Sequence, residues 1–138
     1  MGVIGFESSS SSNFYSWNNT FENNFITLNG VIYINKGKFS DDDSKYYYNA
    51  GLFGGAISLK DVPEAAIENS KFINNYALQG GAIFIRDSTN LNLTLCNFKG
   101  SQAILKGGTI MVTRSALSKS ITYMLKMDQI NIQDSFAF

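Results

Sequence analysis

The sequence contains no histidine, one cysteine (Cys96) and one proline (Pro63). The absence of histidine removes the commonest acid/base and metal-ligating side chain. A lone cysteine excludes both an internal disulfide and a cysteine-based metal cluster. Because no histidine can activate Cys96, we predict that it is a small core side chain and not a nucleophile.

Excess charge and long apolar runs are also lacking. Eleven basic and eleven acidic residues give a net charge of zero, so no basic field attracts nucleic acid or an anionic membrane. No apolar run approaches the roughly 20 residues that a transmembrane helix needs. Residues 1–12 have neither a basic segment nor a long apolar one, so we expect any secretory targeting segment to lie outside this chain.

A glycine motif, in contrast, is present in abundance. Gly80–Ile83 reads Gly-Gly-Ala-Ile, and variants begin at Gly54, Gly107, Asn29 and Met1. A fixed period of this length marks a repeat architecture. The second glycines of the copies are Gly2, Gly30, Gly55, Gly81 and Gly108, with steps of 28, 25, 26 and 27 residues.

A second motif, an aromatic residue followed three positions later by asparagine, repeats in the same phase. Chance is a poor explanation for two landmarks that advance together over four repeats. The aromatics are Phe21, Tyr46, Phe72 and Phe98, with steps of 25, 26 and 26 residues, and the asparagines are Asn24, Asn49 and Asn75, with Ser101 in the fourth copy.

These repeats predict an all-β fold, a right-handed parallel β-helix of about five coils with a period near 26 residues. Each repeat holds two or three short strands and no helical period, and handedness follows from the usual chirality of parallel crossovers. The glycines would permit a positive φ or close backbone approach. The alternative is an antiparallel sandwich. We expect an aliphatic column of Ile32, Ile57, Ile83 and Ile110, an aromatic column, and an asparagine ladder of Asn24, Asn49 and Asn75.

We predict a single β-helix domain over residues 1–138, with loops at 7–13, 36–45 and 113–129. The next aromatic in register after Phe98 is taken as Phe136, which implies an insertion of roughly a dozen residues in the last repeat. Neither end carries a polar cap. The chain is therefore expected to be a segment of a longer solenoid or a unit that stacks end to end.

Candidate chemistry is sparse, and no catalytic residue or cofactor is predicted. The one carboxylate cluster is Asp41, Asp42 and Asp43, which we interpret as a solvated turn with weak calcium binding as the alternative. Arg86 and Arg114 are the only arginines, and their neighbours form no catalytic set. The remaining acids we consider, Asp61, Glu64, Glu68, Asp87, Asp128 and Asp134, are predicted to fall at different phases of the repeat and to share no groove.

Two glycosylation sequons begin at Asn18 and Asn92, and both asparagines are acceptor candidates if the chain is secreted. Exposed Trp17 and the run Tyr46–Tyr48 are candidates for contact with a partner or a glycan. Within that run we expect Tyr46 to be buried in the stack.

The pairing of Phe-x-x-Asn with Gly-Gly-Ala-Ile resembles the repeat of chlamydial polymorphic outer membrane proteins. Similar repeats occur in large ciliate surface proteins, within the pectin-lyase-like β-helix superfamily. Both motifs match literally in Phe72–Ile83, and one each in Gly54–Ile57 and Phe21–Asn24. The departures are at Asn29, Thr109 and Ser101. The resemblance implies a cell-surface or secreted β-helical stalk, often an adhesin, although this chain lacks the membrane barrel of the bacterial family.

We therefore expect a non-enzymatic structural or adhesive module of an extracellular, cell-surface or filamentous assembly. Its expected partners are further β-helix coils of the same or a neighbouring chain, with a glycan or a surface protein as a further possibility. The alternative is a carbohydrate-active enzyme, either a polysaccharide lyase or a hydrolase, or a carbohydrate-binding β-helix.

Overall fold

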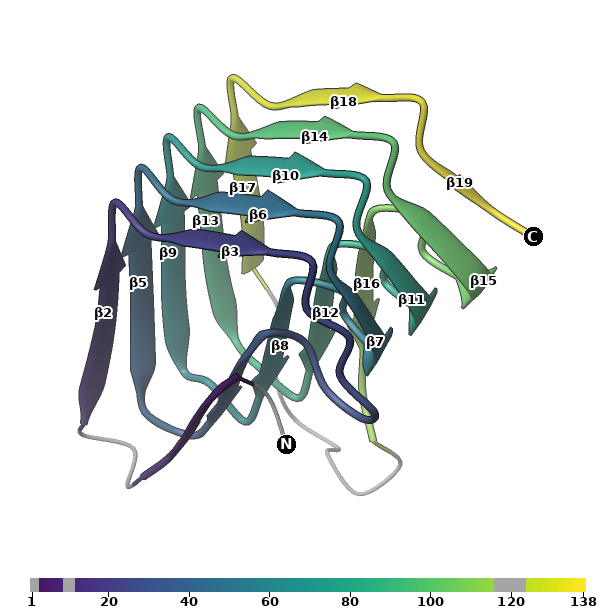
Figure 1. Ribbon diagram of the computed structural model, residues 1–138. Helices are drawn as coiled ribbons and strands as arrows, with labels where there is room; N and C mark the ends of the chain where they lie inside the picture. Colours follow the sequence, from purple (N-terminus) through teal and green to yellow (C-terminus); the bar gives the residue numbers. More distant parts are fainter. Residues whose placement is uncertain (1–2, 9–11, 116–123) are drawn as a thin grey trace.

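The computed structural model describes residues 3–8, 12–115 and 124–138, and in them the chain is a parallel β-solenoid (Figure 1). Every strand pairing is parallel, and no helix is present in the described residues. The predicted β-helix is thus confirmed, and the antiparallel sandwich is wrong. Each full coil has four strands instead of the two or three that we predicted.

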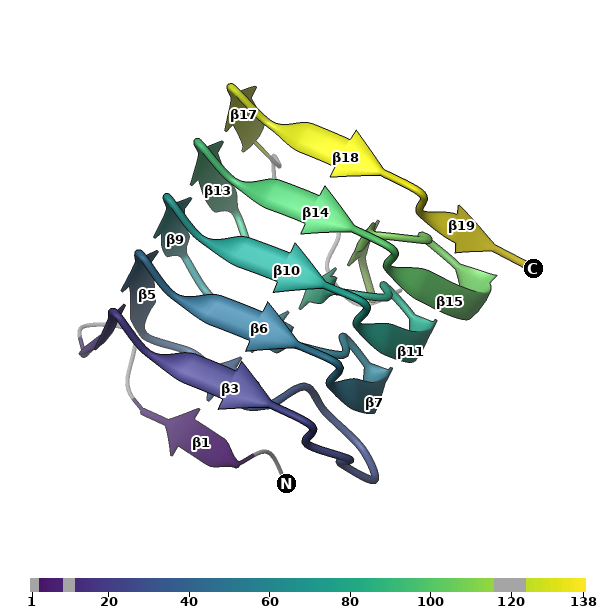
Figure 2. The same ribbon diagram turned by 45° about the horizontal axis from the view of Figure 1, so that its top comes forward.

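The strands stack into four sheets, which we call A to D, and Figure 2 shows successive coils lying one above another. Sheet A contains β1 (Ile4–Glu7), β4 (Ile32–Asn35), β8 (Ile57–Lys60), β12 (Ile83–Arg86) and β16 (Ile110–Thr113). Sheet B contains β2 (Asn13–Trp17), β5 (Lys38–Asp42), β9 (Glu64–Glu68), β13 (Asn90–Thr94) and β17 (Met124–Asp128). Sheet C contains β3 (Thr20–Glu22), β6 (Lys45–Tyr47), β10 (Lys71–Ile73), β14 (Asn97–Lys99) and β18 (Asn131–Gln133). Sheet D contains β7 (Ala50–Phe53), β11 (Tyr76–Gln79), β15 (Gln102–Lys106) and β19 (Phe136–Ala137).

All four corners of the coil use a residue in the left-handed conformation. This conformation turns the chain sharply between short strands, and glycine, asparagine and aspartate adopt it most easily. The corner from A to B has Lys36, Asp61 and Asp87; that from B to C has Asn18, Asp43, Asn69, Leu95 and Gln129; that from C to D has Asn23, Tyr48, Asn74, Gly100 and Asp134; and that from D to A has Gly54, Gly80 and Gly107.

The two glycines of each pair have different roles. The first has a positive φ, as in Gly80 at 65°. The second, such as Gly55, lies directly against the next coil, where a Cβ would come within 2.5 Å of the Gly81 carbonyl oxygen. In the first full copy, Gly30 keeps the second role, with the Ala56 carbonyl oxygen 2.7 Å from its Cβ position. Both roles expected of the glycine pair are confirmed.

The aliphatic and aromatic columns are also confirmed. Ile4 extends the predicted isoleucine column at its start. In the aromatic column, ring centroids are 5.2 Å apart from Phe21 to Tyr46 and 4.7 Å from Tyr46 to Phe72. The stack continues to Phe98 at 4.6 Å. Tyr46, Phe72 and Phe98 are completely buried, so this stack fills the interior along sheet C.

The asparagine ladder runs beside the aromatic column. Asn24 Nδ2 donates to Asn49 Oδ1 over 2.9 Å, and Asn49 Nδ2 donates to Asn75 Oδ1 over 3.1 Å. The second hydrogen of each buried amide is used as well: Asn49 donates to the Phe21 carbonyl and Asn75 to the Tyr46 carbonyl. The ladder therefore joins adjacent coils through side chains that water does not reach.

Three loop predictions need correction. Residues 38–42 of the predicted loop 36–45 form β5, with Phe39 and Asp41 pointing inward. Glu7 and Asn13 of the loop 7–13 belong to strands, as do residues 124–128 of the loop 113–129. Phe39 alone could not reveal the alternation of β5, because the other inward position carries a charge. Residues 1, 2, 9–11 and 116–123, which include parts of the first glycine copy and of two loops, lie outside the described residues.

The register of the last repeat is also corrected. Ile132, not Phe136, pairs with Phe98, and Phe136 instead pairs with Gln102. The step from β14 to β18 is 34 residues, as between Asn97 and Asn131, so the insertion is about eight residues longer than the usual period of 26 and not a dozen. The aromatic column thus ends in an aliphatic residue, which the aromatic motif could not identify.

We predict that Gly81→Ala destabilises the fold by about 3 kcal/mol, because its Cβ would overlap the Gly108 carbonyl oxygen and lie 2.6 Å from the Gln102 carbonyl oxygen. Backbone atoms cannot rotate away as a side chain can. Gly100→Ala is the control, since its Cβ meets only the movable Asn74 side chain, and should lose about 1 kcal/mol to its positive φ. Urea unfolding measures both, and equal losses would contradict this account.

We also predict that Leu95→Asn stabilises the protein by about 0.5–1 kcal/mol. Leu95 has a φ of 54° and an exposed side chain, so asparagine relieves backbone strain without opening a cavity. Leu52→Asn is the control, because Leu52 is exposed in β7 and does not have a positive φ. Thermal unfolding should show a higher midpoint for the first variant only; a lower midpoint for Leu95→Asn would exclude strain at this corner.

Candidate functional site

The outer face of sheet B is the candidate site. Its strands alternate inward and outward residues, and the register places outward residues of successive coils in three rows along the solenoid axis. The first row is Asn13, Lys38, Glu64, Asn90 and Met124; the second is Tyr15, Ser40, Ala66, Asn92 and Lys126; the third is Trp17, Asp42, Glu68, Thr94 and Asp128.

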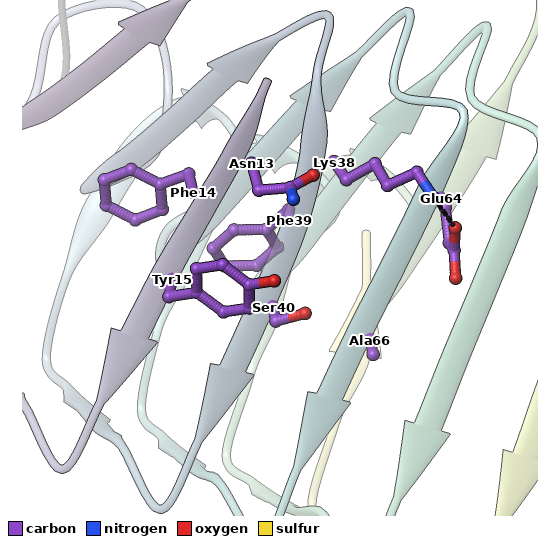
Figure 3. Close-up of a pocket in the computed structure, with 8 residues that line it drawn as sticks. All are labelled: Asn13, Phe14, Tyr15, Lys38, Phe39, Ser40, Glu64 and Ala66. Atoms are coloured by element: carbon purple, nitrogen blue, oxygen red, sulfur yellow. Dashed lines mark ion pairs between the residues drawn. The ribbon is translucent and has the colours of Figure 1, made fainter. Parts of the chain in front are cut away.

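Small residues in the middle row create a groove in this face. Ser40 and Ala66 lie beyond Tyr15 and between the larger side chains of the two outer rows. Two hollows share this floor, one of about 180 Å³ between Tyr15 and the first row and one of about 300 Å³ bordered by Trp17 and the third row. Figure 3 shows the first of them. We call the two together the sheet B groove.

One end of the sheet B groove is aromatic. Tyr15 and Trp17 are two residues apart on β2 and therefore point to the same side of the sheet. Their side chains are 72% and 70% exposed, far from the burial usual for large aromatic residues. The prediction that Trp17 is exposed is confirmed, as is the burial of Tyr46. Tyr15 was missed, because the run around it reads only as mixed aromatic and polar residues.

The two rims of the groove differ in charge. On one rim, Lys38 Nζ lies 2.7 Å from Glu64 Oε2, and this hydrogen bond raises the pKa of Lys38. On the other rim, Asp42 and Glu68 are direct neighbours in the register. Asn69 Nδ2 donates to Asp42 Oδ1 over 2.9 Å, which leaves the negative charge of the pair unneutralised. This rim is therefore acidic.

The alignment of acids on this rim corrects a prediction. Glu68 and Asp128 were expected at different phases of the repeat, yet both lie in the row of Asp42 and Thr94. Asp61 and Asp87 likewise occupy equivalent corners. The error follows from the loop assigned to residues 36–45. Once that segment is a strand, Asp42 and Glu68 are one period of 26 residues apart.

The three consecutive aspartates do not form a metal site. Asp41 points into the core and is 1% exposed, Asp42 points outward, and Asp43 occupies a corner with a φ of 54°. No three histidine, cysteine, aspartate or glutamate side chains of the described residues gather closely enough to hold a metal ion. The interpretation of the run as a solvated turn is also wrong for Asp41, which is an interior residue.

Asp41 is surrounded by hydroxyl groups. Ser70 Oγ donates to Asp41 Oδ2 over 2.8 Å, and the hydroxyls of Ser16, Ser44 and Tyr46 also lie close to the carboxyl group. Burial raises the pKa of Asp41, and these hydroxyls lower it in part. Burial, followed by the charge of Asp41, raises the pKa of Tyr46 well above its usual range. The coils near the N-terminus thus contain a buried polar cluster.

Cys96 occupies the column that holds Ser44 and Ser70 in the preceding coils. Its Sγ donates to the Ile67 and Thr94 carbonyls over 3.4 and 3.3 Å, and the side chain is 1% exposed. Burial raises the pKa of its thiol to about 11. Since a nucleophilic cysteine needs a thiolate, the prediction of a core side chain is confirmed.

The sequon asparagines lie at different places on the surface. Asn18 is exposed at the corner after β2, with a φ of 50°. Asn92 points outward from the middle of β13, in the same row as Ala66 and Lys126. Both side chains can be reached from outside, and glycosylation of either stays a prediction.

The two arginines do not join a catalytic group. Arg86 borders a third hollow of about 170 Å³ on sheet A, together with Tyr33, Ser58 and Lys60. No carboxylate lines this hollow among the described residues. Arg114 is exposed beyond the end of β16.

Within the described residues, no helix has the length and apolarity needed to cross a membrane. Comparisons with protein-family models, with curated proteins and with solved structures find no match to this chain. The structural result on family is therefore the parallel β-solenoid itself.

We predict that stability falls as the pH rises through the pKa of Asp41. The pKa is raised above its ordinary value of 3.8, so between the two values the folded state holds more protons than the unfolded state. Linkage then makes unfolding easier as pH increases. Asp41→Asn should remove this decline and exceed the wild type in stability at neutral pH.

Urea unfolding from about pH 3 to 8 tests this linkage. Asp42→Asn is the matched control, because Asp42 is the next residue and points outward. Tyr46 and Cys96 are the other titratable groups near Asp41, and their raised pKa values place them outside this range. A constant difference between wild type and Asp41→Asn across the range would show that Asp41 does not titrate there.

Proposed function

We propose that this chain is a structural or adhesive β-helix module that stacks along its axis against a further β-helical coil. The observation that carries this proposal is the apolar last coil. Leu125, Met127 and Ile132 are 44%, 42% and 46% exposed, although they continue the columns of buried Leu91, Leu93 and Phe98. Side chains at interior positions are thus open to solvent.

The backbone of this coil supports the same proposal. In the described part of the chain, β16, β17, β18 and β19 are each the last strand of their sheet. Such strands present unpaired N–H and C=O groups, which readily pair with another strand. Covering the coil would bury apolar side chains and complete four sheets at once.

The first coil of a second copy is a suitable cover. Stacked in the same direction, it would place Ile4 over Ile110 and Phe21 over Ile132, which continues both interior columns. Ser16 would meet Met127, a less favourable pair. A head-to-tail contact of this kind repeats without closing and builds a filament.

The finer family assignment and the location belong to this proposal. Support for a pectin-lyase-like, right-handed β-helix of a cell-surface or extracellular protein comes from the literal motif matches in Phe72–Ile83. The outward-facing sequon residues Asn18 and Asn92 are consistent with a secretory route. A long solenoid of this type would hold its lateral surfaces away from a cell, where a surface protein or glycan could be met.

A carbohydrate-active enzyme is the second candidate. One observation favours it: the adjacent carboxylates of Asp42 and Glu68 border a groove that also holds two exposed aromatic side chains. Paired carboxylates are the usual catalytic groups of glycosidases. Turnover of oligosaccharides that is lost in both Asp42→Asn and Glu68→Gln would establish this activity in place of a purely structural role.

We predict that the isolated chain self-associates as its concentration rises, and that Ile132→Lys weakens this association at least about tenfold. A lysine there places a charge in the apolar contact between coils. Sedimentation velocity over a wide concentration range measures the effect. Leu52→Lys is the control, because Leu52 is similarly exposed, at 41%, on the side of the solenoid.

Two results would contradict stacking at the last coil. One is a wild-type chain that stays monomeric at every concentration. The other is equal weakening by Ile132→Lys and Leu52→Lys, which would point to association through the sides of the solenoid. Circular dichroism of both variants distinguishes lost association from lost folding.

A further inference from the structure

We propose that the sheet B groove binds a neutral saccharide chain. The groove lies on the side wall of the solenoid, formed by β2, β5 and β9. It is separate from the apolar last coil and does not depend on stacking. A module could therefore assemble through its end and bind a glycan through its side at the same time.

The aromatic pair supplies the apolar part of the site. The C–H faces of a pyranose ring are apolar, and they pack well against the flat face of tryptophan or tyrosine. Tyr15 and Trp17 expose such faces on one side of β2. Exposed aromatic residues that group together mark contact surfaces, because solitary burial in the core would be more favourable.

The floor and rims supply the polar part. Ser40 and Ala66 are small enough to let a sugar ring approach the sheet, and the Ser40 hydroxyl can donate or accept a hydrogen bond. Asp42 and Glu68 present acceptors for sugar hydroxyls on one rim, and Lys38 and Glu64 present a donor and acceptors on the other. An apolar patch with a few convergent polar groups is the usual composition of a ligand site.

The charge of the groove selects against acidic sugars. Lys38 contributes one positive charge, and Glu64, Asp42 and Glu68 contribute three negative ones, which leaves a net charge of −2 at the rims. Lys38 is already paired with Glu64. A uronate, a sulfated sugar or a nucleic acid would thus meet repulsion, whereas a neutral glycan would not.

The only tryptophan of the chain is Trp17, so its fluorescence reports on this groove alone. We would titrate the full chain with neutral gluco-, manno- and xylo-oligosaccharides and, separately, with oligogalacturonate. We expect saturable changes in Trp17 emission with at least one neutral series and no saturation with oligogalacturonate. The absence of a saturable change with every neutral series, or tighter binding of oligogalacturonate, would overturn the proposal.

Ala66→Phe fills the groove floor while keeping Trp17 as the probe, and we expect it to weaken binding at least tenfold. Ala50→Phe is the matched control: Ala50 is the counterpart of exposed Tyr76 on sheet D, outside the groove, and its substitution should leave binding unchanged. Binding that survives Ala66→Phe would exclude the groove as the site. Sedimentation of the two variants would separate this outcome from a failure of coil stacking.

Discussion

The structure depends on the stacking of each residue on its counterpart one coil away. Parallel pairing with a period near 26 residues repeats every position of one coil directly above the same position of the previous coil, roughly 4.8 Å along the axis. Each column must therefore hold side chains that are compatible with copies of themselves. Aromatic rings satisfy this by stacking, and amides do so because asparagine both donates and accepts.

The same repetition applies at the corners. A residue that turns the chain in one coil needs an equivalent in every coil, which explains why left-handed residues form four columns. Glycine is required only at the corner from D to A, where Gly55 and Gly81 also bring backbones of adjacent coils together. Elsewhere asparagine, aspartate and even Leu95 suffice, because their side chains point to solvent.

Self-stacking constrains the interior more strongly than the outer face. Asp41 shows that one charged group can be accommodated inside when hydroxyls such as Ser70 surround it. On the outer face a column is free to change, and sheet B uses this freedom: small Ser40 and Ala66 follow bulky Tyr15. The groove arises from this change of size along one row. A rigid repeat can thus carry a local binding surface without any departure from its backbone.

The sequence by itself determined the period, the two interior columns and the asparagine ladder, because glycine pairs and Phe-x-x-Asn motifs recur at positions where the backbone allows few alternatives. It did not reveal β5, since the inward Asp41 hides the alternation, and it misplaced the last aromatic column, which ends in Ile132. Only the tertiary structure decided that Asp42 and Glu68 are neighbours and that Tyr15 overlooks a hollow. The physical reason is that motifs record the constraints of the interior, whereas the outer face is assembled by register between coils and leaves no motif of its own.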